Sequence, residues 1–463
     1  MSILEISVEL IYMVAIALFV VGLKRMTSPA TARAGNQMAA VAMLIGVAVT
    51  LLDRNILNFE LIIAGIVVGG LIGGIAAKKV EMTSMPEMVA LFNGVGGLSS
   101  VLVALGEYYR YIAMGETMNV DAIVTVGLSV LIGAVTFTGS IMAFAKLKGL
   151  ITGNPITFPM QTALNGILLL VAFVATAFVV VDQSNEMLFL SVLGIALVLG
   201  VLVVLPIGGA DMPVVISLLN SYSGVAASMA GFVLGNKLLI VAGALVGSAG
   251  LILTIIMCKA MNRSLTNVLF GAFGGDSNAV DNRDIDKSYR EMMAEDVAIL
   301  TAYAQRVIIV PGYGLAVAQA QHVVREVADI LEAKGVDVRY GIHPVAGRMP
   351  GHMNVLLAEA NIPYNQLYDM DDINPDFEKT DVVLIIGAND VVNPDARENP
   401  ASPIYGMPIL NVDYAKATIV LKRSMNPGFA GIDNVLFYKQ NNYMYFGDAK
   451  KSLQNLVTAL KDL

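Results

Sequence analysis

Long apolar stretches, separated by short polar loops, fill residues 1–262, and the pattern changes after that point. A bilayer core of about 30 Å requires roughly 20 apolar residues per helix. The second stretch is short for a span, which makes it the weakest of the set. The pattern predicts nine membrane-spanning helices, at residues 8–23, 38–52, 59–77, 86–106, 121–145, 163–181, 187–206, 211–234 and 237–258.

Basic residues collect in alternate loops between these helices, nine in one set of loops and three in the other. Loops rich in Lys and Arg usually remain on the cytoplasmic side of a membrane. We therefore expect the N-terminus outside and the C-terminal part in the cytoplasm. The richer set is Lys24, Arg25, Arg33, Lys78, Lys79, Lys146, Lys148, Lys259 and Arg263, and the poorer set is Arg54, Arg110 and Lys237.

Beyond residue 262 short apolar runs alternate with helical stretches, which indicates a doubly wound parallel sheet. The sequence thus predicts a polytopic all-α membrane domain (1–262), a polar linker (263–290) and an α/β Rossmann-like parallel-sheet domain (291–463). Strands are expected at 307–310, 336–340, 381–386, 408–412 and 418–422, and helices at 289–304, 316–334, 353–360 and 449–460.

Composition supports a chain that lies largely in lipid. Hydrophobic residues make up 56% and charged residues 14%, with a mean hydropathy of +0.70, whereas soluble proteins carry about 25% charged residues. The net charge of −8 argues against nucleic acid as a partner. A single cysteine, Cys258, rules out an intrachain disulfide or a thiolate metal cluster, and no metal site is expected. Because no basic leader or cleavage motif precedes it, the first apolar stretch is expected to remain as a span.

A glycine motif, Gly312-Tyr-Gly-Leu-Ala-Val317, follows the first predicted strand and opens a helix. It fits G-x-G-x-x-V, in which the first glycine permits a tight turn and the second lets the backbone approach a pyrophosphate. A plain structural turn is the alternative interpretation. The second strand leads into Val338–His343 without the terminal carboxylate of an NAD site. A later strand ends in Lys422-Arg-Ser424, which suits a phosphate dianion and favours NADP(H), unless it is only a solvated strand end.

Two titratable residues near the predicted strand ends are candidate sensors of the cofactor state. Asp390 lies in Gly387–Pro394, at the carboxyl end of a buried strand, and is either a conformation-sensitive carboxylate or a turn former. His343 is a residue type that titrates near neutral pH.

Polar residues also occur within the apolar helices. Asn93 and Asn220 are expected at matching depths of roughly 12–14 Å, Ser140 lies in a run of small residues, and Asp211 lies at the cytoplasmic end of a span. Such groups are costly in lipid and are often functional, so a water-filled path is one hypothesis. The alternatives are an Asn–Asn hydrogen bond between helices and an N-cap role for Asp211.

Several long segments resemble the beta subunit of the proton-translocating NAD(P) transhydrogenase, from about Glu5 to the C-terminus. The resemblance implies that the C-terminal domain binds NADP(H) and that an alpha subunit, of one or two chains, carries NAD(H). It also implies a dimer of alpha-beta units in a bacterial inner membrane, with hydride transfer coupled to proton passage. The matching segments are Gly208–Val215, Leu219–Gly224, Ile256–Ser264, Pro311–Gly314, Gly341–Leu357, Gly387–Asp390, Lys422–Ser424 and Phe446–Ala449.

The same resemblance implies which residues contact NADP(H), and it implies a cofactor reversed relative to an ordinary Rossmann site. The Gly312–Val317 motif is therefore not expected to make every usual contact. The segment Asn426–Gly431 resembles a loop that folds over the nucleotide, although many members have Tyr where Phe429 stands. The implied contacts are Tyr313, Val345, Ala346, Gly347, Arg348, Met349, Pro350, Gly387, Ala388, Asn389, Asp390, Val391, Gly406, Met407, Lys422, Arg423, Ser424, Met425, Asn426, Pro427, Gly428, Phe429, Asp448 and Ala449.

One departure from the family concerns Asn93, since some members have a histidine at this point that is treated as a proton carrier. Asparagine does not titrate, so we expect the titrating group on the partner chain, with Asn93, Ser140, Asp211 and Asn220 along the path. Two other classes compete with this interpretation. They are a transporter or channel with a regulatory NADP(H)-binding domain and a membrane-anchored NADP-dependent reductase.

Overall fold

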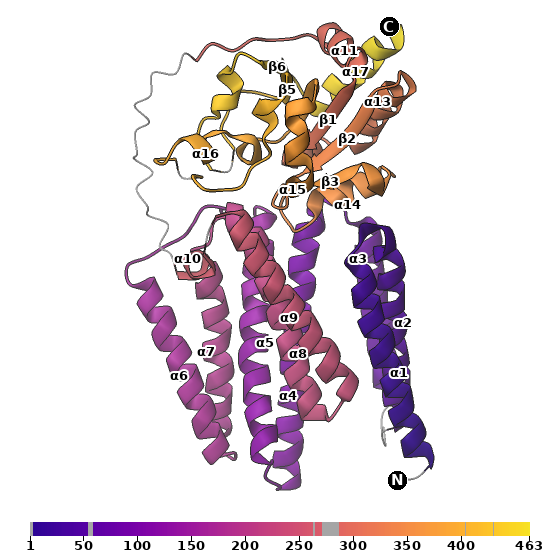
Figure 1. Cartoon of the computed structure of the whole chain (residues 1–463). Helices are drawn as coiled ribbons and strands as arrows, with labels where there is room; N and C mark the ends of the chain where they lie inside the picture. The colour runs from indigo at the N-terminus through magenta and orange to yellow at the C-terminus, as the bar shows by residue number, and fades with distance from the viewer. Residues whose placement is uncertain (1–2, 54–58, 263, 271–286, 403, 429) are drawn as a thin grey trace. The chain divides into compact units, whose positions relative to one another are not determined.

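The computed structural model describes residues 3–53, 59–262, 264–270, 287–402, 404–428 and 430–463 (Figure 1). Phe429, Arg54, Arg263 and most of the predicted linker lie outside these ranges. The chain divides into a helical unit, residues 1–206 and 215–253, and a second unit, residues 207–214 and 254–463. Each unit is described by itself.

Nine helices within the described ranges are long and apolar enough to span a bilayer, as the sequence predicts (Figure 1). The weakest prediction, the second, is a helix of 25 residues because alanine-rich residues at its start extend it. The fourth runs eight positions beyond its predicted end at residue 106, to a left-handed C-cap at Gly115. The helices are α1 (Ile3–Met26), α2 (Pro29–Asp53), α3 (Phe59–Lys79), α4 (Met85–Met114), α5 (Val120–Leu147), α6 (Gln161–Val181), α7 (Glu186–Val204), α8 (Met212–Leu234) and α9 (Lys237–Ala260).

The C-terminal residues form a six-stranded parallel sheet in the order β3-β2-β1-β4-β5-β6, which confirms the predicted fold class within the described part. The strands are β1 (Arg306–Pro311), β2 (Asp337–Ile342), β3 (Leu367–Asp369), β4 (Val382–Ile386), β5 (Ala417–Lys422) and β6 (Asn442–Phe446). The helices are α10 (Leu265–Phe270), α11 (Ala294–Ala302), α12 (Tyr313–Val317), α13 (Gln321–Ala333), α14 (His352–Glu359), α15 (Met370–Ile373), α16 (Asp395–Glu398) and α17 (Ala449–Asp462).

The predicted strand at 408–412 is wrong. The N–H of Leu410 donates to Val391 O at 3.0 Å and that of Asn411 donates to Asn374 Oδ1 at 2.9 Å, so this segment bonds to loops instead of a strand. Two strands, β3 and β6, were missed by the sequence patterns. The edge strand β6, with the sequence Asn-Tyr-Met-Tyr-Phe, holds too few aliphatic residues to resemble a buried strand.

Two predicted helices also differ from the structure. The helix expected at 316–334 is divided into α12 and α13, because Gln319 between them adopts a left-handed φ of 48°. The helix expected at 289–304 begins only at Ala294. The residues before α11 instead run along β6, where Met292 N–H donates to Met444 O at 3.0 Å and Met444 N–H donates to Arg290 O at 2.7 Å.

Both faces of the sheet are buried, as a parallel sheet requires. Ile308 and Val310 of β1 enter one apolar core with Val383 and Ile385 of β4, and Phe377 packs against them. The residues between them in each strand are also buried, on the opposite face. Burial of each such side chain stabilises the fold by about 1.5–3 kcal/mol. This packing holds the strand ends, and the loops that leave them, in fixed mutual positions.

Candidate functional site

The loops that follow β1, β2, β4, β5 and β6 meet at one edge of the sheet, because all of these strands are parallel. Pro311 at the end of β1 pairs with Ile386 of β4, and Lys422 at the end of β5 pairs with Phe446 of β6. The strand order reverses between β1 and β4. Ligands of open α/β sheets bind at such a switch point, outside the carboxyl ends of the strands. Most of the site residues expected from the sequence lie in these loops.

The two glycines of the motif make close backbone contacts with the loop after β4. Gly312 N–H donates to Ile386 O and Gly314 N–H donates to Gly387 O, both at 2.9 Å. A Cβ at position 312 would lie 2.4 Å from the Cα of Ala388, and one at position 314 would lie 2.7 Å from the Cα of Gly387. The close approach of the loop after β4 is therefore enough to require both glycines.

The last residue of the motif, Val317, is 45% exposed. A small residue at the end of a dinucleotide motif normally packs between helix and sheet, and Val317 does not do so. The sequence of the motif fits the pattern better than its structure does.

The loop after β2 packs against the loop after β1. The Arg348 guanidinium lies 4.5 Å above the Tyr313 ring, within the range of a cation–π contact. The N–H of Arg348 donates to Nδ1 of buried His352 at 3.0 Å. Gly347 has a φ of 108°, and a Cβ there would lie 2.5 Å from the same Nδ1. These contacts fix residues 345–350, which the resemblance assigns to the cofactor.

His343 does not have the environment of a sensor that titrates near neutral pH. The side chain is 1% exposed, its Nδ1 accepts the N–H of Val345 at 3.2 Å, and its Nε2 lies 2.8 Å from Pro408 O. Burial lowers the pKa of His343 from 6.5 to about 4. A role for His343 as a sensor therefore stays a prediction, and it would require a conformation in which the ring is less buried. Its ring is a neutral link between the loop after β2 and the segment that contains Gly406 and Met407.

Asp390 is more than a turn former, because its carboxylate leaves its own turn and contacts the segment after β5. Its Oδ2 accepts the N–H of Ala430 at 2.9 Å. A Cβ on Gly428 would lie 2.6 Å from Oδ1, so a larger residue there would displace the Asp390 carboxylate. The loops after β4 and β5 are therefore held together by a negative charge.

Asn434 is a site residue that the sequence analysis missed. Its side chain is fully buried, and Nδ2 donates to Asn389 O at 3.0 Å while Oδ1 accepts the N–H of Leu436 at 3.0 Å. Asn434 therefore holds the loop after β4, and it lies in the same stretch of chain as Ala430, which Asp390 contacts. No sequence pattern would reveal it, since its partner lies 45 positions away.

The end of β5 presents an open cationic surface. Arg423 and Ser424 are exposed. Lys422 is half-buried, with its amine 4.7 Å above the Phe437 ring, and donates to Asn426 O. Burial lowers the pKa of Lys422, and the negative charges of Asp390 and Asp433 oppose that shift. A guanidinium, an amine and a hydroxyl at one strand end form a donor set that fits a phosphate dianion.

The remaining expected residues lie beside this strand end. The N–H of Gly447 donates to Lys422 O at 3.0 Å, which places the start of α17 next to β5. Asp448 caps α17, since its Oδ1 accepts the N–H groups of Lys450 and Lys451 at 3.1 and 3.3 Å. Ala449 is the first residue of that helix.

Among the polar side chains expected along the path, Asn93 bonds to a backbone carbonyl of α8 and not to the Asn220 side chain. Asn93 is 6% exposed and donates from Nδ2 to Ile216 O at 3.2 Å, on the turn of α8 that leads to half-buried Asn220. Ser140 is fully buried, and its hydroxyl has no protein partner among the described residues. A Cβ on Gly94 would lie 3.2 Å from that of Ser140, so α4 and α5 are in close contact there. Asp211, in the short turn Gly209–Asp211 before α8, belongs to the second unit and is 1% exposed.

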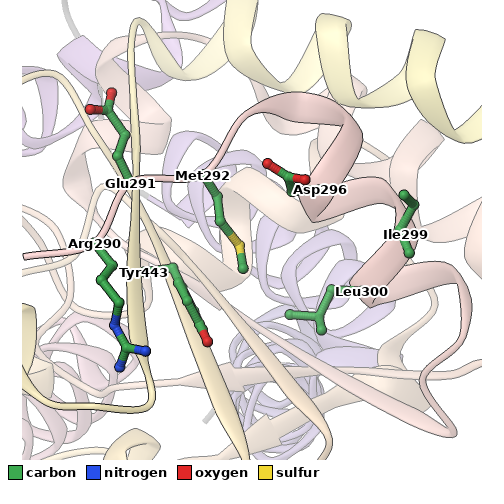
Figure 2. Close-up of a pocket in the computed structure, with 7 residues that line it drawn as sticks. All are labelled: Arg290, Glu291, Met292, Asp296, Ile299, Leu300 and Tyr443. Atoms are coloured by element: carbon green, nitrogen blue, oxygen red, sulfur yellow. The ribbon is translucent and has the colours of Figure 1, made fainter.

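A hollow of about 470 Å³ lies between α11 and β6, and Figure 2 shows Arg290, Met292, Asp296 and Tyr443 around it. The Arg290 guanidinium lies 4.9 Å above the Tyr443 ring. None of the residues that line this hollow belongs to the expected cofactor site. It lies along the edge strand, whereas the expected residues follow the carboxyl ends of the strands.

A set of apolar spanning helices, followed by a doubly wound sheet with a cationic strand end, defines the class: a membrane protein with a Rossmann-like domain. A family model described as NAD(P) transhydrogenase beta subunit matches residues 8–459. NAD(P) transhydrogenase subunit beta of Rhodospirillum rubrum is 50% identical over 455 residues, which cover 97% of this chain and 98% of the relative. A second relative of the same description, from the strain ATCC 11170, has the same identity and coverage. The chain belongs to the NAD(P) transhydrogenase beta subunit family.

Proposed function

We propose that this chain binds NADP(H) at the carboxyl edge of its sheet and that an alpha subunit presents NAD(H) to it. Hydride transfer between the two coenzymes is coupled to proton translocation. The family supports transhydrogenation, and a beta subunit implies an alpha partner. The cationic end of β5, Lys422–Ser424, at the switch-point edge carries the assignment of NADP(H) to this chain, because a 2′-phosphate requires such donors.

The residues of this chain bind and orient the coenzyme. Lys422, Arg423 and Ser424 would hold the 2′-phosphate, and the contact of Asp390 with Ala430 would position the segment that borders it. The coenzyme, when bound, supplies the hydride donor or acceptor. The loops after β1 and β2, joined by Tyr313 and Arg348, complete the border of the site.

The proton path in this proposal uses Asn93, Ser140, Asn220 and Asp211. The buried hydroxyl of Ser140 would be satisfied by a water molecule, since an unpaired buried polar group costs about 1–3 kcal/mol. Asparagine and serine can bind water but cannot store a proton, and Asp211 lies at the end of a span, so the titrating group within the helices is proposed to come from the partner. A proton that crosses 100 mV releases about 2.3 kcal/mol. By linkage, that free energy alters how tightly the C-terminal domain binds NADP(H).

The arrangement in the cell follows from the same proposal. Residues 1–262 form the proton-translocating domain, residues 263–290 the linker, and residues 291–463 the NADP(H)-binding domain in the cytoplasm. The N-terminus lies outside a bacterial inner membrane, and two alpha-beta units form the working dimer. The bias of basic residues between alternate loops supports this orientation.

Vesicles that contain the chain together with an alpha subunit test the proposal. NADH labelled with deuterium on one face of the nicotinamide should transfer the label directly to NADP+, with proton movement in the same preparation. Both signals should require the alpha subunit. Solute permeation without the alpha subunit would favour the channel alternative, and loss of the label to water would exclude direct hydride transfer.

A further inference from the structure

An ion pair joins the start of the described C-terminal residues to the segment after β5. The Nζ of Lys287 lies 2.9 Å from Oδ2 of Asp433, with side chains 67% and 43% exposed. The Tyr438 hydroxyl donates to the same oxygen at 3.2 Å. Lys287 is thus the cation that faces Asp433 most directly.

Asp433 lies in the part of the chain that supports the loop after β4. Its backbone carbonyl accepts from Nδ2 of Asn393 at 3.0 Å, and the next residue, Asn434, donates to Asn389 O at 3.0 Å. At the other end of this segment, Ala430 donates to Asp390 at 2.9 Å. A shift of Asp433 would therefore be transmitted to the loop that begins at Gly387.

The residues after Lys287 are anchored to the sheet. Arg290 and Met292 share backbone hydrogen bonds with Met444 of β6, and the same stretch is visible beside Tyr443 in Figure 2. Lys287 therefore lies three residues before Arg290, whose backbone is fixed to β6. The contact with Asp433 is a bridge between this edge segment and the cofactor loops.

The charge of Asp433 also acts on Lys422, whose pKa it raises against the effect of burial. Lys287 pairs directly with Asp433 and offsets its charge. When Lys287 is absent, the negative field of Asp433 at the end of β5 is less compensated, and a bound phosphate dianion is less stable there.

We propose that Lys287 is a positioning residue for NADP(H), acting through Asp433 to hold the segment 430–434 and to neutralise a carboxylate beside the phosphate-binding strand end. The inference rests on the proposed function. Because the pair is exposed, the effect is modest: Lys287→Gln should raise the Kd for NADP+ about two- to fivefold at low salt. Screening should reduce that difference at high salt.

Calorimetric titration of NADP+ into the full chain, purified with its alpha subunit, tests the inference. Lys287→Arg should keep wild-type affinity, because it keeps the charge. Lys461→Gln is the matched control, since Lys461 lies 2.7 Å from Glu326 in a pair of similar exposure, 58% and 48%, on α17 and α13. That variant should leave the Kd unchanged.

A double-mutant cycle separates positioning through Asp433 from any other effect. In an Asp433→Asn background, Lys287→Gln should change the Kd no further. An unchanged Kd in the single variant, or an equal increase in both backgrounds, overturns the role of Lys287 and leaves NADP(H) binding intact. A wild-type chain that does not distinguish NADP+ from NAD+ would instead overturn the proposed function itself.

Discussion

Gly314→Ala tests whether the glycine motif serves protein packing or the coenzyme. The added Cβ would lie 2.7 Å from the Cα of Gly387 and 3.2 Å from its carbonyl oxygen, both backbone atoms that cannot rotate away. Overpacking costs about 1–3 kcal/mol, and alanine in α12 recovers roughly 0.5–1 kcal/mol relative to glycine. We expect a net loss centred on about 1 kcal/mol, which lowers the Tm of a domain of this size by roughly 2–4 °C.

Scanning calorimetry of the purified full chain measures this change in Tm. The transition that belongs to the C-terminal domain is identified as the one that added NADP+ shifts. Gly341→Ala is the matched control, because its Cβ would meet side-chain carbons of Ile373 and Ile308 at 3.4 and 3.5 Å, which are ordinary contacts. The control should keep or slightly raise the Tm. A Gly314→Ala variant with wild-type Tm and greatly weakened NADP+ binding would refute the packing explanation.

Three further predictions concern other parts of the molecule. The depressed pKa of His343, about 4 instead of 6.5, means that the unfolded chain binds more protons between those values. The contribution of neutral His343 to the free energy of unfolding is therefore complete above pH 6.5 and is lost as the pH falls toward 4. Denaturant unfolding should show a smaller loss of stability over this pH range in His343→Gln than in the wild type. The Asp413 side chain is 2% exposed and pairs with Arg397 at 2.6 Å and Lys439 at 2.8 Å; because both cations are partly exposed and also face Glu398, Asp413→Asn should destabilise the domain by about 1–3 kcal/mol in urea unfolding. Asn220→Leu should retain NADP+ binding but lower proton translocation in vesicles at least about tenfold; translocation at the full rate would exclude the water path.

The spanning helices could be predicted from the sequence because hydrophobicity over some 20 residues is a local property. Strands needed more than a local pattern. Residues 408–412 are mostly apolar and mostly buried but find no strand partner, whereas β6 pairs with β5 although it begins with Asn442 and contains no Val, Ile or Leu. Pairing along the sheet decided these elements, and neighbouring residues alone do not reveal it.

For the candidate site, the residue types could be predicted better than their environments. The contact of Asp390 with Ala430 spans 40 positions and that of His343 with Pro408 spans 65, so both depend on the completed fold. The unperturbed pKa of histidine suggested a sensor, but burial changes that chemistry. The glycine motif likewise predicts a turn correctly, while the neighbour that approaches it is a loop of the protein.

Calorimetric titration of the full chain with NADP+ and with NAD+, at one fixed salt concentration, tests the central claim most directly. Charge-assisted hydrogen bonds to the 2′-phosphate should contribute about 1.5–3 kcal/mol, so NADP+ should bind roughly 10- to 150-fold more tightly. Arg423→Met should remove much of that preference and leave NAD+ binding unchanged. Equal affinity for the two coenzymes in the wild-type chain would contradict the assignment of NADP(H) to the end of β5.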